Sequence, residues 1–162
     1  MKPLPHTDSK GASHMVNVGG RDPSDRAAIA RGEITMSPDT IETLRAHDLA
    51  KGDALATARI AGIQAAKETS RIIPLCHPIA LTHVHVGLTL LPDRIQVETR
   101  VESRGRTGVE MEALTATSVA LLTLYDMAKG IDRSMVIHAV RVVDKTGGTH
   151  PEGFTDPLAD AT

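Results

Sequence analysis

The strongest constraint on the fold is the segment 113–125, which carries no charge and is apolar around nearly the whole circumference of a helix. Thr107 and Glu110 precede it with the spacing of a capping box, so the sequence predicts a helix that continues to about Lys129. A helix without a polar face has to be covered on both sides. One side can pack on a sheet, but a chain of 162 residues has few segments left to cover the other. We therefore expect the chain to form oligomers.

The composition of the chain excludes several classes of protein. Eighteen Lys and Arg against twenty Asp and Glu give a net charge of −2, which argues against a polybasic protein that binds nucleic acids or membrane surfaces. Tyr125 and Phe154 are the only aromatic residues, so stacking platforms for nucleic-acid bases are not expected. The single cysteine, Cys76, excludes a disulfide framework and fits a reducing compartment. No signal peptide is recognisable and no apolar run approaches the ~18 residues of a membrane span, so a cytoplasmic location is expected.

Alternating and helical patterns divide the chain into further elements. Ser37 and Pro38 begin a short helix that runs to about residue 46, and Asp53 caps a longer helix that ends before Pro74. Extended segments are predicted at 15–18, 26–36, 80–91, 95–102 and 135–143. The last of these is apolar on both faces, so we expect it in the centre of the sheet.

The order of the elements predicts an α+β fold of the ferredoxin-like type (βαββαβ). It has an antiparallel sheet with helices on one face, extra N-terminal strands and a short helix. The polar stretches 1–13 and 149–162 are expected to be tails, the first of them flexible. Residues 14–148 then form a single domain.

Ionisable residues stand at both ends of the apolar helix. Glu110 and Glu112 lie at its start, while Asp126 and Lys129 lie at its end and share a face. A solvated ion pair is the common case, but the apolar turns before Asp126 favour a half-buried carboxylate that exchanges protons with the lysine. Burial would raise the pKa of this carboxyl and the ammonium would lower it, so the direction of the shift stays open. Glu112 and Asp126 are ~21 Å apart along the helix. They therefore serve different parts of a long ligand, or the site is assembled from two subunits.

The segment 74–78 is stiffened by two prolines. Cys76 and His77 lie between these prolines. They belong either to a rigid connector with a buried thiol or to a cradle that presents His77 to a ligand. Further along, His83 and His85 share one face of a strand. No additional Cys or carboxylate stands at ligand spacing, so a surface pair is favoured over a metal site.

Basic residues lie at the ends of several elements, namely Arg26, Lys51, Lys67, Lys129 and Lys145. Lysines beside glycine-rich turns and helix starts suit phosphate, because backbone N–H groups and a point charge act together there. The spacing is not that of a Walker A loop. Taken singly, each lysine is more often a solvated surface residue.

Seven segments, in order along the chain, together resemble the MoaC family: 15–18, 51–53, 58–67, 73–78, 107–116, 125–129 and 145–148. The blocks IPLCHP at 73–78 and TGVEMEALTA at 107–116 are the most specific of them. The resemblance covers residues 14–148.

The resemblance implies a cyclic pyranopterin monophosphate synthase of molybdenum cofactor biosynthesis. Such an enzyme converts 3′,8-cyclo-7,8-dihydro-GTP to cyclic pyranopterin monophosphate and pyrophosphate. The family also implies a ferredoxin-like fold and a hexamer of three dimers, with active sites at the dimer interfaces. The sequence indicates no required cofactor and no resident metal, and it leaves open whether Mg²⁺ accompanies the triphosphate. The expected partners are a small-molecule substrate and further copies of the chain, without nucleic acid or membrane.

Matched residue by residue, the resemblance implies a catalytic acid/base at Asp126 and catalytic lysines at Lys51 and Lys129. The segments that contact substrate in the family match Leu75, Cys76, His77, Met111 and Glu112. Residues that line or support that site match Arg26, Lys67, Glu110 and Lys145. The chemistry asks for such groups, because ring opening and closure need positioned proton carriers and a leaving pyrophosphate is stabilised by fixed positive charge.

The chain departs from the family pattern in two places. Asn17 replaces the usual Asp, and the segment 149–153 replaces the usual Lys-Ser-Gly. One cation that the family pattern provides for a phosphate is therefore missing, and His150 is the candidate to replace it. Two other functions compete with the synthase. One is a non-catalytic phosphometabolite-binding protein on the same scaffold. The other is a metal-dependent hydrolase that uses the side chains of His77, His83, His85 and Glu112.

Overall fold

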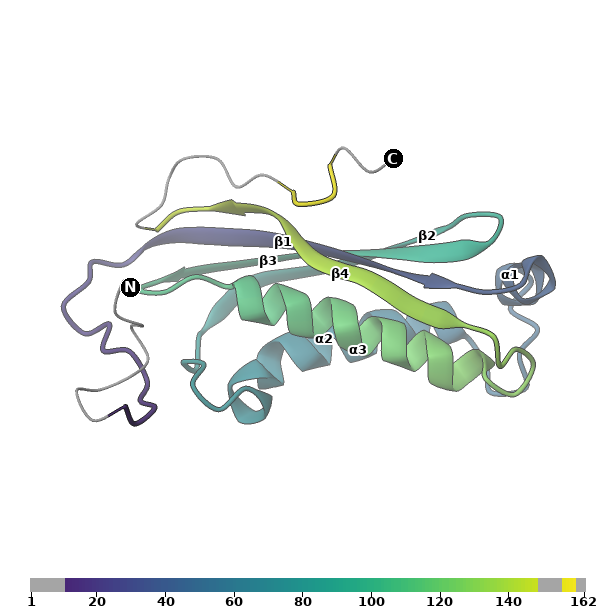
Figure 1. Cartoon of the computed structure of the whole chain (residues 1–162), viewed down its shortest axis with the longest axis horizontal. Helices are drawn as coiled ribbons and strands as arrows, with labels where there is room; N and C mark the ends of the chain where they lie inside the picture. The colour runs from purple at the N-terminus through teal and green to yellow at the C-terminus, as the bar shows by residue number, and fades with distance from the viewer. Residues whose placement is uncertain (1–10, 149–155, 160–162) are drawn as a thin grey trace.

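The computed structural model describes residues 11–148 and 156–159. Most of the expected N-terminal tail and residues 149–155 and 160–162, His150 among them, lie outside this described part. The elements follow in the order β1 (Ser24–Thr35), α1 (Pro38–Arg45), α2 (Ala54–Ile72), β2 (Leu81–Leu90), β3 (Arg94–Gly105), α3 (Glu110–Ala128) and β4 (Val136–Thr146). Helices α2 and α3 lie side by side under one face of the sheet (Figure 1).

The sheet has the strand order β2-β3-β1-β4, and every neighbouring pair is antiparallel. The α+β class and the antiparallel sheet are therefore confirmed. Strand β1 pairs with β3 in a continuous register that sets Ile34 opposite Ile95. Alternate side chains of these two strands form the buried helix-facing side: Ala28, Ala30, Ile34, Ile95, Val97 and Val101.

The expectation that the last strand is central is wrong. Strand β4 is at the edge of the sheet and pairs only with β1 among the described residues. The prediction assumed that the apolar side chains on both faces of this strand are covered. Some are not, since Val136 is 55% and Val140 36% exposed. Apolar side chains on both faces of a strand indicate a central position only if both faces are covered within the chain.

Helix α3 is covered on its second side by α2, a cover that the sequence did not lead us to expect from within the chain. The two helices approach closely because small residues face each other. A Cβ added at Gly62 would lie 3.1 Å from the carbonyl oxygen of Ala116 and 3.4 Å from the Cβ of Ala120. The cover is incomplete, since Met111 and Leu122 on α3 are 37% and 58% exposed.

The starts of two helices follow the sequence, and the third does not. Ser37 accepts a hydrogen bond from the backbone N–H of Thr40, and Asp53 accepts one from Ala56, so both predicted N-caps are confirmed. The predicted capping box at Thr107 is wrong, because α3 begins after Val109 without a side-chain cap. Glu110 pairs instead with a lysine across the site described below.

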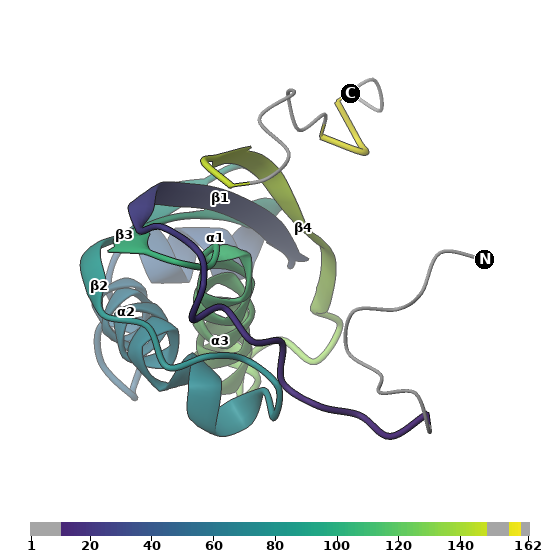
Figure 2. The same cartoon turned by 90° about the vertical axis from the view of Figure 1, so that its left-hand side faces the viewer.

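The expected N-terminal strand at 15–18 is also wrong. This segment is irregular and crosses in front of the start of α3 in Figure 2. It is held by individual contacts, with the carbonyl of Val16 hydrogen-bonded to Nε2 of His77 (2.8 Å) and the carbonyl of Gly19 to Arg106. A segment that pairs with loops rather than with a sheet edge has no ladder to make it a strand.

No helix in the part of the chain that the structure describes is long and apolar enough to cross a membrane.

Candidate active site

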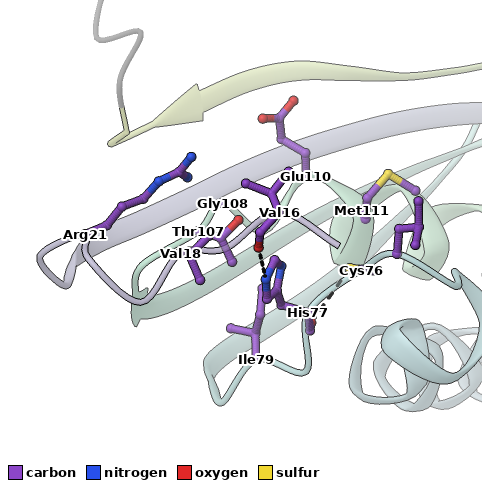
Figure 3. A pocket seen from close by; sticks show the side chains of 11 residues that line it. Val16, Val18, Arg21, Cys76, His77, Ile79, Thr107, Gly108, Glu110 and Met111 are labelled. Carbon is purple, nitrogen blue, oxygen red and sulfur yellow. Dashed lines mark hydrogen bonds between the residues drawn. The ribbon is translucent and has the colours of Figure 1, made fainter. Parts of the chain in front are cut away.

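A pocket of about 400 Å³ opens beside the start of α3, between the N-terminal segment and the loop after α2 (Figure 3). The residues that line it are Val16, Val18, Arg21, Leu75, Cys76, His77, Ile79, Thr107, Gly108, Glu110 and Met111. Four of the five residues predicted to contact substrate, Leu75, Cys76, His77 and Met111, therefore line one pocket with Glu110, although they come from two distant parts of the sequence. Pockets of a few hundred Å³ are typical of small-molecule sites.

A second pocket, of about 180 Å³, continues from the first, because Arg21, Thr107, Gly108 and Glu110 line both. Its remaining walls are Arg26, Lys145, Gly147 and Gly148. Three cationic side chains thus line the same pocket as one carboxylate, and Lys145 Nζ lies 3.1 Å from Oε1 of Glu110. The surplus of positive charge suits an anion with several oxygens.

The backbone of the second pocket needs its glycines. Gly147 and Gly148 have φ of 82° and 102°, in the left-handed region that favours glycine. A Cβ at Gly147 would also overlap the carbonyl oxygen of Asp25. The same turn brings Gly148 close to the guanidinium of Arg26. Backbone groups in such turns form concave anion sites.

His77 is held against the N-terminal segment. Its Nε2 lies 2.8 Å from the carbonyl oxygen of Val16, and Figure 3 shows this contact across the pocket wall. The two-proline segment therefore places this imidazole in the wall of the pocket. That it presents His77 to a ligand stays a prediction.

Glu112 lies behind the wall of the pocket and is almost completely buried, with 3% exposed. The thiol of Cys76 donates to its Oε1 at 3.4 Å, and Oε2 has no hydrogen-bond partner within the described residues. Burial raises the pKa of this carboxyl, which favours its neutral form. Burial and the nearby carboxylate also raise the pKa of Cys76 to about 11, so this thiol is protonated at neutral pH.

At the other end of α3, Asp126 lies between two lysines. Lys129 Nζ is 2.6 Å from Oδ1. Lys51 Nζ is 3.1 Å from Oδ2 and 2.7 Å from the backbone oxygen of Asp126. Lys51 comes from the loop between α1 and α2, so the structure joins residues that are far apart in sequence. We call Lys51, Asp126 and Lys129 the carboxylate–lysine cluster.

The cluster is more exposed than the sequence suggested. The side chain of Asp126 is 58% exposed, so the expectation of a half-buried carboxylate is wrong for the single chain. The reason is that it leaves the last turn of α3 on the outer side, towards the loop that carries Lys51. Hydrogen bonds from Lys129 and Lys51 lower the pKa of the Asp126 carboxyl, and the carboxylate raises the pKa of Lys129. The direction that the sequence left open is thus set by the ammonium groups.

The remaining predicted residues are not brought into either group. Lys67 is exposed on α2 and lines neither pocket. His83 and His85 are exposed on β2. The described residues contain no group of three or more His, Cys, Asp or Glu that could hold a metal ion, so the metal-dependent hydrolase finds no support in this part of the chain.

Arg21 lines both pockets and was not among the predicted site residues. It directly follows Gly19 and Gly20, and it stands just before β1. A basic residue beside a glycine pair is the same signal that drew attention to Lys145, so the pattern was present in the sequence but was not used.

Comparison with known proteins shows the family to which the chain belongs. Residues 15–148 match the model of the MoaC family. Three similar relatives are each described as a cyclic pyranopterin monophosphate synthase. That of Roseiflexus sp. is 55% identical over 96% of this chain and 100% of its own length. That of Roseiflexus castenholzii is 54% identical over 94% of this chain and 98% of its own length. That of Heliobacterium modesticaldum is 53% identical over 91% of this chain and 94% of its own length. The chain is thus an α+β enzyme that acts in the biosynthesis of a cofactor. It belongs to the MoaC family.

Proposed function

We propose that the chain acts as a cyclic pyranopterin monophosphate synthase in molybdenum cofactor biosynthesis. The family match and the near-complete overlap with relatives of that description support this activity. The observation that carries the proposal is the presence, at opposite ends of α3, of a cation-lined pocket and of a carboxylate held by two lysines. The substrate would be the cyclised GTP derivative 3′,8-cyclo-7,8-dihydro-GTP, and the reaction would release pyrophosphate.

The two joined pockets divide the substrate between them. The smaller pocket receives the triphosphate, because Arg21, Arg26 and Lys145 supply positive charge beside the glycine turn. The larger pocket receives the ring system, with His77 and the backbone of the cradle as polar partners. The described pocket walls contain no Phe, Tyr or Trp side chain, so hydrogen bonds rather than stacking on a large ring would orient the substrate.

The carboxylate–lysine cluster supplies proton transfer and positive charge. Asp126 is ionised at neutral pH, as an ordinary aspartate is, and the two lysines lower its pKa further. It can therefore accept a proton from the substrate and return it later. Lys129 and Lys51 carry fixed charges that would stabilise the oxygen of the departing pyrophosphate. Whether Mg²⁺ accompanies the triphosphate stays an open prediction.

The two halves of the site would meet between two copies of the chain. They stand at opposite ends of one 19-residue helix, so they cannot act on the same atom within one chain. Exposed apolar side chains on the helices, Leu122 (58%) and Ile60 (67%), would be covered by such an assembly. The hexamer of three dimers, the ferredoxin-like arrangement and the cytoplasmic location belong to the same proposal. The strand order β2-β3-β1-β4 supports the ferredoxin-like arrangement.

The test is the release of pyrophosphate from the cyclised GTP derivative by the full chain. The proposal expects turnover with formation of cyclic pyranopterin monophosphate. Tight binding of the triphosphate without release of pyrophosphate would identify a phosphometabolite-binding protein instead. Loss of all turnover after exhaustive chelation, restored by a transition metal and not by Mg²⁺, would point to the hydrolase.

A further inference from the structure

One buried carboxylate has no part in either half of the proposed site. Asp132 lies in the loop between α3 and β4, three residues after Lys129, and is 7% exposed. A buried carboxylate is costly unless its oxygens are hydrogen-bonded. Both oxygens of Asp132 are, and their partners come from two separate parts of the chain.

The first oxygen of Asp132 organises its own loop. Oδ1 accepts hydrogen bonds from the backbone N–H of Ser134 (2.8 Å) and from its hydroxyl (2.7 Å). The backbone N–H of Asp132 continues from α3 by bonding to the carbonyl of Ala128 (3.1 Å). The loop is therefore a rigid extension of the helix end that carries Asp126 and Lys129.

The second oxygen reaches the start of α1. Oδ2 accepts hydrogen bonds from the backbone N–H of Ser37 (2.8 Å) and from the hydroxyl of Thr40 (3.3 Å). Ser37 is the N-cap of α1, and Thr40 is buried in its first turn. The carboxylate thus binds the positive end of this helix.

Helix α1 in turn leads into the loop that carries Lys51. Several backbone hydrogen bonds make this loop a defined structure, among them Asp48 N–H to Thr43 (3.1 Å) and Gly52 N–H to Leu49 (2.9 Å). His47 also lies 3.5 Å from the carboxylate of Asp53, the cap of α2. A shift of α1 relative to α3 would therefore move Lys51 relative to Asp126.

We propose that Asp132 is a positioning residue that ties the start of α1 to the end of α3 and so sets the distance between Lys51 and Asp126. This inference rests on the proposed role of the carboxylate–lysine cluster. A misplacement of about 1 Å in such a cluster can cost ~100-fold in rate. The sequence offered no signal for this role, because the partners lie in segments that are distant along the chain.

The chain offers a matched pair of variants. Thr40→Val removes a hydroxyl that binds Asp132 from α1, whereas Ser134→Ala removes one that binds it from within its own loop. Both delete one donor to the same carboxylate, but only Thr40→Val weakens the tie between the two segments. We expect kcat to fall in Thr40→Val with little change in KM, and to stay near the wild-type value in Ser134→Ala at a similar loss of thermal stability.

Asp132→Asn is the stronger variant, because an amide cannot accept from both sets of donors. We expect kcat to fall by ~10–100-fold. In a plot of kcat against pH, the decrease on the acid side should move to higher pH. The groups that face Asp126 are Lys51 and Lys129, with Tyr125 beside the latter. Once Lys51 withdraws, only Lys129 still lowers the pKa of the Asp126 carboxyl. Asp39→Asn, which removes an exposed carboxylate from the same first turn of α1, should leave kcat and the profile unchanged.

The outcomes separate the two proposals. If Asp126→Asn keeps wild-type turnover, the role of the cluster is wrong and the positioning role falls with it. If Asp126→Asn is inactive while folded Asp132→Asn and Thr40→Val keep the kcat and pH profile of the wild type, only the positioning role is overturned. Equal losses of kcat in Thr40→Val and Ser134→Ala would also overturn it, and this comparison remains decisive if Asp132→Asn does not fold.

Discussion

At the residue scale, the chain places three carboxyl groups in three electrostatic settings along or just after one helix. Asp126 is ionised between two ammonium groups, Glu112 is buried with one oxygen unpartnered, and Asp132 is buried and fully hydrogen-bonded. Burial raises the pKa of Glu112, whereas hydrogen bonds lower the pKa values of Asp126 and Asp132. Each setting leads to a separate prediction.

Asp126→Asn tests the carboxylate that we assign to proton transfer. The variant should fold and assemble, because the replaced side chain is exposed and its ion pairs are screened by solvent. Its rate of pyrophosphate release should fall by at least ~100-fold, the contribution typical of a general acid or base. Size-exclusion chromatography and circular dichroism check the fold. A well-folded variant with the wild-type rate would contradict the assignment.

Asp132 predicts how stability changes in acid. Hydrogen bonds from Ser37 and Ser134 lower the pKa of this carboxyl to about 2 in the folded chain, against ~3.9 when unfolded. Its stabilising contribution is therefore complete above pH ~4 and is lost as the pH falls towards 2. Thermal unfolding between these values should show a steeper loss of stability for the wild type than for Asp132→Asn. Parallel curves would count against the ionised, hydrogen-bonded carboxylate.

Glu112 predicts the opposite dependence. Burial raises the pKa of its carboxyl, so the folded state is favoured below the pKa of the unfolded chain and loses stability as the pH rises through the folded value. Glu112→Gln removes this cost while keeping an acceptor for the thiol of Cys76. We expect the variant to be at least as stable as the wild type at pH 8. The measurement is the stability of the variant minus that of the wild type at pH 5 and at pH 8. A difference that is clearly less favourable to the variant at pH 8 would refute this reasoning.

At the element scale, local patterns predicted the helices and the β2–β3 hairpin well, because spacing and capping act within a few residues. Ser37 and Asp53 cap their helices as the sequence indicated. The failures all depend on distant contacts. Strand β4 is at an edge, Thr107 lines the pockets instead of capping α3, and residues 15–18 bind loops.

The same distinction applies to the candidate site. Motifs identified most of the residues that line the pockets, such as His77 and Lys145. They did not reveal Arg21, and they led us to expect a half-buried Asp126, whereas this side chain is exposed. Asp132 could not be found from local patterns, because its four donors are divided between α1 and its own loop.

The turn after β4 gives a prediction at this scale. Gly147 has a φ of 82°, and an added Cβ would overlap the carbonyl oxygen of Asp25. Gly147→Ala should therefore distort the turn, at a cost of at least ~1–2 kcal/mol from the left-handed backbone alone. We expect weaker binding of inorganic pyrophosphate by calorimetry. Gly130→Ala, at a site where the added Cβ meets nothing within 4 Å, is the matched control and should bind as the wild type does. Equal affinities for both variants would show that the turn is no part of the anion site.

At the scale of the whole molecule, the account depends on the separation of the two halves along α3. The pocket with Arg26 lies near one end of the helix and the cluster with Asp126 at the other. In a symmetric pair of chains, each chain would contribute one half to each of two sites. Exposed Leu122 and Ile60 provide apolar surface for such an association.

Complementation between two inactive variants tests this claim most directly. Asp126→Asn and Arg26→Gln chains would be unfolded together, reassembled at equal concentrations and assayed for pyrophosphate release. Mixed pairs contain one site with both halves intact, so the account predicts recovery of about a quarter of the wild-type activity. A mixture of Asp126→Asn with Lys51→Ala, both in the same half, should recover nothing. If the first mixture is as inactive as its components although mixed assemblies form, each chain holds its own complete site and the central claim is contradicted.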